Sequence, residues 1–124
     1  MSELARIDVE ELGTRRLIRI NGEVDISNSR ELATAIERAV SDGVEGVVID
    51  LSGTTYLDSA AVELLFRLAA RLQGRRLELR LLVPADAPTR AVLELTGLHQ
   101  VVPLETSLND AASVDPGPAG TSSF

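Results

Sequence analysis

The segment Val47-Val48-Ile49-Asp50-Leu51 constrains the fold of this chain more than any other. It is a short, nearly continuous run of apolar and mostly β-branched residues, without the polar–apolar alternation of a half-exposed strand. Such a run is typical of a strand that is covered on both faces, as in a parallel sheet packed between helices. We therefore expect helices on both sides of this segment in the sequence.

Apolar residues at helical spacing do flank the run. Before it, Leu32, Ile36 and Val40 follow Asn28, which forms a possible capping box with Glu31 at the start of a helix. After it, a second helix is predicted over residues 60–72, and Pro88 is suited to the first turn of a third helix. We expect that third helix to end at the glycine cap Thr96-Gly97-Leu98, and a short last helix over Ser107–Ala112.

Further strands are predicted at residues 4–12, 16–21, 77–83 and 101–104, with an antiparallel hairpin formed by the first two. The proline in the last of these strands favours a sheet edge. The predicted fold class is therefore α/β: a single domain with a mixed, mostly parallel sheet of about five strands and about four helices. We expect residues 1–112 to form this domain and residues 113–124, rich in Pro, Gly and Ser, to be a disordered tail.

Charge and composition exclude several functions. The net charge of −7 disfavours binding to nucleic acids or to an anionic membrane surface. All basic residues are arginines, so the lysine of a P-loop is missing. With one histidine and no cysteine, zinc sites built from these residues are excluded, and no cofactor is expected. No signal peptide or membrane span is visible, so we expect a cytoplasmic protein.

Polar residues cluster where two predicted strands end. Asp25 follows the second strand, and the segment 52–59 with Thr55, Asp58 and Ser59 follows the third. If these strands are neighbours, both loops meet at the carboxyl edge of the sheet, where sites of α/β proteins gather. Ser59 at the start of a helix is a candidate phosphoacceptor, because a helix N-terminus favours a phosphate group.

Other interpretations of these residues stay open. Asp58 or Ser59 could simply be the N-cap of the helix, and Ser52, Thr54 or Thr55 could provide a second modified hydroxyl. A hydrolytic role of Ser59 has little support, since the only histidine, His99, lies after the third helix. A small-molecule or nucleotide site at the same loops rests only on the nearby carboxylates.

Four segments together resemble the STAS domain family in order and spacing, over roughly residues 5–112, and more narrowly the bacterial anti-sigma factor antagonists. They are Gly22-Glu23-Val24-Asp25-Ile26, Val48-Ile49-Asp50-Leu51-Ser52, Tyr56-Leu57-Asp58-Ser59-Ala60 and Leu95-Thr96-Gly97-Leu98. The Asp-Ser segment is the most specific of them.

The resemblance implies a regulatory protein rather than an enzyme. Members of this family bind an anti-sigma factor, a serine kinase of the histidine-kinase-like ATPase type, and so release a sigma factor. Phosphorylation of the serine that matches Ser59 ends this binding, and a metal-dependent serine phosphatase restores it. By this resemblance, partner contacts are expected at Asp25, Asn28, Thr55, Asp58, Ser59, Ala60 and Ala61.

The sequence departs from the family pattern directly after the serine. Ala60 and Ala61 stand where the family commonly has a small residue followed by glycine. This departure motivates an alternative function, a non-switching STAS interaction module of a transporter or sensory complex.

Overall fold

The structure is a computed structural model that describes residues 5–40 and 43–112; the predicted tail and Leu4 lie outside the described residues. Its centre is one sheet with the strand order β1-β2-β3-β5-β6. A sixth strand, β4, pairs with the last residues of β2. The strands are β1 (Ala5–Leu12), β2 (Arg15–Val24), β3 (Gly46–Asp50), β4 (Thr54–Leu57), β5 (Glu78–Leu82) and β6 (Leu104–Glu105). The β1–β2 hairpin is antiparallel and the other pairs are parallel, which confirms the predicted mixed, mostly parallel sheet.

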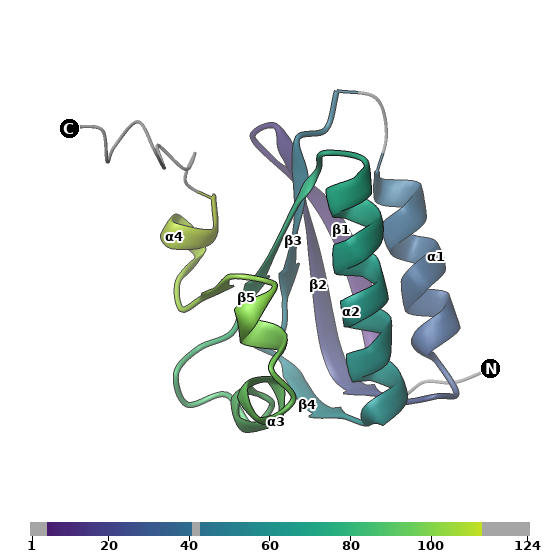
Figure 1. The fold of residues 1–124 in the computed structure, drawn as a ribbon, viewed down its shortest axis with the longest axis vertical. Coiled ribbons are helices and arrows are strands. Elements are labelled where there is room, and N and C mark those ends of the chain that lie inside the picture. Colours follow the sequence, from purple (N-terminus) through teal and green to yellow (C-terminus); the bar gives the residue numbers. More distant parts are fainter. Residues whose placement is uncertain (1–4, 41–42, 113–124) are drawn as a thin grey trace.

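The helices of the described residues form layers on the two faces of the sheet. They are α1 (Ser29–Ala39), α2 (Ser59–Gly74), α3 (Arg90–Leu95) and α4 (Leu108–Ala112), with a 3-10 turn η1 (Leu98–Gln100). Figure 1 shows α1 and α2 side by side on one face and the short α4 on the other. The connection from β2 through α1 to β3 is thus a helical crossover between parallel strands, as the sequence predicts.

Strand β3 is covered on both faces, as expected from its composition. Successive residues of a strand point to opposite sides. Val47 and Ile49 accordingly belong to the main core with α1 and α2, while Val48 packs with Leu17 and Leu82 in a smaller cluster on the α4 side. Val47, Val48 and Ile49 are all fully buried.

Residues 52–57, predicted as a loop, contain the extra strand β4. It extends the sheet along the far end of β2, where the Thr54 hydroxyl donates a hydrogen bond to the Ile20 carbonyl at 2.7 Å. Gly53 lies against the Asn21 side chain so closely that a Cβ at position 53 would overlap it. Thr54, Thr55 and Tyr56 are residue types common in strands, but a segment of four residues forms a strand only through its pairing with β2.

The predicted capping box at the start of α1 is wrong. Asn28 occupies the N-cap position, but its side chain makes no capping hydrogen bond. Its Oδ1 accepts from the Asp25 backbone N–H at 2.9 Å, and its Nδ2 donates to the Glu23 carbonyl at 2.9 Å. The amide therefore holds the turn that precedes the helix, because the buried side chain has backbone partners on that side.

Two predictions near the C-terminus also need correction. Pro88 lies in a turn, and α3 begins at Arg90, after Thr89. The strand predicted at residues 101–104 is only Leu104–Glu105, because η1 and its hydrogen bonds continue the turn through Val102. The glycine cap is confirmed: Gly97 has φ +83°, in the left-handed region that glycine tolerates, and the next residue is buried.

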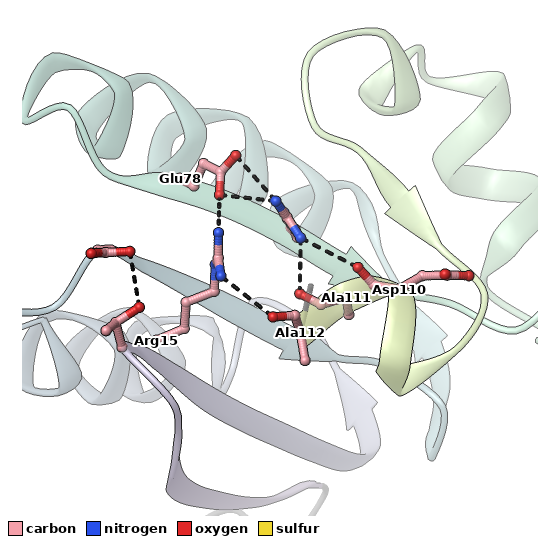
Figure 2. A network of polar contacts seen from close by, with 8 residues as sticks. Arg15, Glu78, Asp110, Ala111 and Ala112 are labelled. Carbon is pink, nitrogen blue, oxygen red and sulfur yellow. Dashed lines mark hydrogen bonds and ion pairs between the residues drawn. The ribbon is translucent and has the colours of Figure 1, made fainter. Parts of the chain in front are cut away.

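Two buried arginines fix α4 on its face of the sheet (Figure 2). The Arg15 guanidinium bridges Glu78 at 2.6 Å and the Ala112 carbonyl at 3.5 Å. Arg80 donates to the Ala111 carbonyl at 3.2 Å and forms an ion pair with the same glutamate at 3.2 Å. The carbonyls at the end of a helix carry partial negative charge, so the two cations stabilise α4 where its own hydrogen bonds end.

Replacing Arg80 by alanine is expected to destabilise the domain. Arg80→Ala removes hydrogen bonds between a charged donor and α4, so the free energy of unfolding should fall by about 2 kcal/mol. Urea denaturation of the wild type and the variant measures this loss. Arg75→Ala, at an exposed position after α2, is the control and should change stability by less than about 0.5 kcal/mol. Equal effects of the two substitutions would contradict the role of Arg80.

The same network makes stability depend on pH through Glu78. Partial burial by itself raises the pKa of this carboxyl, but the hydrogen bond from Arg15 and the charge of Arg80 outweigh it and lower the pKa below its ordinary value of 4.5. A carboxyl with a lowered pKa in the folded state stabilises at neutral pH, and this contribution is lost as the pH falls through 4.5 and below. The stability gap between wild type and Glu78→Gln should therefore shrink between pH 6 and pH 3. A gap independent of pH would disprove this linkage.

Candidate functional site

Asp58 joins the two loops that the sequence places at the carboxyl edge of the sheet. Its Oδ1 accepts from the Ala61 backbone N–H at 2.9 Å and thus caps α2. Its Oδ2 accepts from the Ile26 backbone N–H at 3.1 Å, and its own N–H donates to the Val24 carbonyl at 3.2 Å. One carboxylate therefore fixes both the start of α2 and the loop after β2, and it brings the Asp25 loop next to Ser59 as expected.

The loop after β2 is held from its other side by Asp25 and Asn28. Asp25 Oδ1 accepts from the hydroxyl of Ser27 at 2.5 Å and from its backbone N–H at 2.8 Å. These two hydrogen bonds hold the pKa of Asp25 below its usual value, so the carboxylate stays charged at neutral pH. Together with Asp58, it places two negative charges near the start of α2.

Ser59 is the first residue of the 16-residue helix α2, and it is exposed. The capping role belongs to Asp58, so the Ser59 hydroxyl is not needed for it and makes no hydrogen bond to any described residue. The first N–H groups of a helix lack partners within the helix, and the dipole favours an anion there. The position is therefore accessible and chemically suited to a phosphate ester.

The other predicted residues differ in accessibility. Thr55 is exposed on β4 and Ala60 is half-buried on α2, whereas Ala61 is 1% exposed and belongs to the main core. Of the hydroxyls predicted as second acceptors, Ser52 and Thr55 are exposed, but Thr54 is fully buried. The Ala61 methyl group thus faces the core rather than a partner.

The structure adds an apolar hollow that the sequence analysis missed. It has a volume of about 640 Å³ and lies beside Ser59, lined by Ile26, Ser59, Ala60, Val62, Glu63, Phe66 and Thr96. Ile26 is 77% exposed, and Leu95, next to Thr96 in the chain, is 86% exposed. Exposed apolar side chains that gather beside a hollow are a common feature of interaction surfaces. An isoleucine between Asp25 and Ser27 in a polar loop was the available signal for it.

Two classes of site find no support among the described residues. No group of three or more His, Asp or Glu side chains is arranged to hold a metal ion within residues 5–40 and 43–112. In the same part of the chain, no helix has the length and apolar character needed to cross a bilayer.

Comparison with known proteins finds relatives that match most of the chain. The anti-sigma-F factor antagonist RsfB of Mycobacterium tuberculosis is 30% identical over 95 residues, which are 77% of this chain and 76% of that protein. An anti-sigma factor antagonist from Mycobacterium paratuberculosis superposes with a TM-score of 0.77 at 30% identity, over 86% of this chain and 90% of the other.

More distant structures share the fold. SpoIIAA of Bacillus, at 21% identity and over 82% of this chain, superposes with TM-scores of 0.66 in its unphosphorylated and 0.62 in its phosphorylated form, covering 90% and 93% of those chains. The model of the STAS domain family matches residues 6–111, which is most of the chain. The chain belongs to the STAS domain family.

Proposed function

We propose that the chain is a cytoplasmic anti-sigma factor antagonist whose binding to an anti-sigma factor is switched off by phosphorylation of Ser59. The observation that carries this proposal is the exposed Ser59 hydroxyl, which stands at the N-terminus of α2 with the capping role already taken by Asp58. The two relatives at 30% identity, both named as antagonists of anti-sigma factors, support the same function.

In the unphosphorylated state, the partner covers the hollow beside Ser59. The exposed Ile26 and the half-buried Phe66 supply apolar surface, whose removal from water favours binding. The hydrogen bond from Ile26 N–H to Asp58 fixes the loop before the partner arrives, so less conformational entropy is lost on association.

Phosphorylation changes the charge of this surface without requiring a new fold. The partner kinase, which we propose to be of the histidine-kinase-like ATPase type, transfers the γ-phosphoryl group of ATP to Ser59 Oγ. The bond between this group and the β-phosphate oxygen breaks, and ADP and the hydroxyl proton are released. The ester adds a charge of about −1.5 to −2 at a point where Asp25 and Asp58 are already negative. An acidic partner surface is then repelled, and an apolar one can cover the site only by removing the phosphate charge from water, which is unfavourable. A metal-dependent serine phosphatase restores binding by hydrolysing the ester to serine and inorganic phosphate.

Substitutions of Ser59 test the switch directly. Ser59→Ala should bind the anti-sigma factor as the wild type does and should accept no phosphate when the kinase and ATP are added. Ser59→Asp places a charge at the same position and should weaken binding at least tenfold, which corresponds to about 1.4 kcal/mol. Isothermal titration calorimetry measures the affinities, and intact mass measures the phosphate.

Ser107→Asp is the matched control, because it adds the same charge at an exposed residue before α4, outside the hollow. It should bind like the wild type. If Ser59→Ala and Ser59→Asp bound equally well, or if the phosphate appeared on another residue, the proposed switch would be wrong.

Two substitutions of Asp58 separate its two contacts. Asp58→Ala removes both, and loss of the cap alone should lower the free energy of unfolding by about 1 kcal/mol. Asp58→Asn can keep the cap with its remaining oxygen. Its NH2 group then faces the Ile26 N–H, and because both groups are donors this hydrogen bond is lost. Asp58→Asn should therefore lose little stability while hydrogen exchange of the Ile26 amide accelerates and binding weakens. Unchanged exchange at Ile26 in both variants would argue against the bridge.

A further inference from the structure

A second groove lies between α1 and α2, which Figure 1 shows side by side, and residues of both helices line it. It has a volume of about 480 Å³. Small and apolar residues line its floor, among them Ala33 from α1 and Leu64 and Leu68 from α2. The two leucines are each less than a tenth exposed. Small residues such as Ala33 allow another backbone to approach closely.

The rim of this groove is rich in arginine, although the chain as a whole is acidic. Three arginines, Arg30, Arg67 and Arg71, line it against two glutamates, Glu37 and Glu63, so the rim is slightly positive whereas the chain has a net charge of −7. Arg71 forms an ion pair with Glu37 at 2.8 Å across the far end. Arg30 and Arg67 make no ion pair with any described residue, so their charges are available to a partner.

The groove is continuous with the hollow beside Ser59. Ile26, Ala60 and Glu63 line both, so a partner that covers Ser59 reaches the mouth of the groove without a gap. From Ala60 to the Arg71–Glu37 ion pair, α2 rises by roughly 16 Å, at about 1.5 Å per residue. That length accommodates about three turns of a docked helix.

We propose that the groove between α1 and α2 binds a short amphipathic helix of the anti-sigma factor, with an apolar stripe flanked by acidic residues. This inference rests on the proposed function, because it assigns a second contact region to the same partner. The apolar stripe packs on the exposed Ile26 and the half-buried Ala33, above a floor of Leu64 and Leu68. The acidic flanks pair with Arg30 and Arg67. Binding of an amphipathic helix in an apolar groove is a common mode of recognition.

An acidic occupant also accounts for the effect of one phosphate group on a large interface. The groove begins at Ala60, directly after Ser59, so a phosphate on Ser59 lies next to the first turn of the docked helix. Its charge of about −1.5 to −2 repels the acidic flank that Arg30 and Arg67 attract. Phosphorylation thereby weakens the contact in the groove as well as the contact in the hollow.

A pair of double variants tests the groove. Arg30→Glu with Arg67→Glu reverses the charges that face the occupant, whereas Arg38→Glu with Arg75→Glu makes the same change in charge at exposed positions outside the groove. Binding to the purified anti-sigma factor is measured by calorimetry at two salt concentrations, after thermal denaturation has shown that each variant is folded. The groove variant should lose at least tenfold in affinity and part of the salt dependence, because exposed charge pairs are screened by salt. The control should stay within about twofold of the wild type.

The outcomes separate this inference from the proposed function. If the wild type binds and Ser59→Asp does not, while the groove variant binds like its control, the function stands and the groove proposal is overturned. If the wild type does not bind any anti-sigma factor of its own genome, both are overturned.

A photo-crosslinking amino acid at Ala33 identifies the occupant, with one at the exposed Ala70 as control. Mass spectrometry of the crosslinked complex should find an acidic, amphipathic segment of the anti-sigma factor joined to position 33 and little at position 70. A basic segment at position 33, or equal crosslinking at both positions, would refute the proposal.

Discussion

Burial of strand β3 on both faces is the constraint on which the rest of the structure depends. Val47 and Ile49 need a helical layer on one side, and Val48 needs cover on the other. The chain meets the first demand with α1 and α2 and the second with α4, the side chains of Leu17 and Leu82, and two arginines that hold α4 in place. A five-residue helix has little stability of its own. Arg15 and Arg80 keep α4 on the sheet through hydrogen bonds to its last carbonyls, and both arginines are in turn paired with Glu78.

The same arrangement creates the site. Because β2, β3 and β4 are parallel, the loops that follow them come together at one edge of the sheet. Asp58 then uses both carboxylate oxygens, one for α2 and one for the Ile26 loop, so that the helix start and the loop form one rigid surface. Ser59 is left exposed at the centre of this surface, with its hydroxyl free of a structural role.

Arginines on the two faces of the sheet differ in burial and in their contacts. On the α4 face, Arg15 and Arg80 are buried and act in folding. On the helical face, Arg30 and Arg67 are exposed and form no ion pair within the described residues, so they are available for recognition. Burial decides between these uses, since an unpaired charge is tolerated only in water.

The sequence by itself determined the features that depend on local chemistry. The hairpin, the buried run at β3, the helix α2 and the glycine at position 97 followed from periodicity and turn residues, and the four matching segments pointed to the STAS family. Only the tertiary structure decided the rest: the strand β4, the backbone partners of Asn28, the inward direction of Ala61 and the two apolar depressions near Ser59. Each of these depends on contacts between residues that are distant in the chain, and such contacts cannot be read from the local sequence pattern.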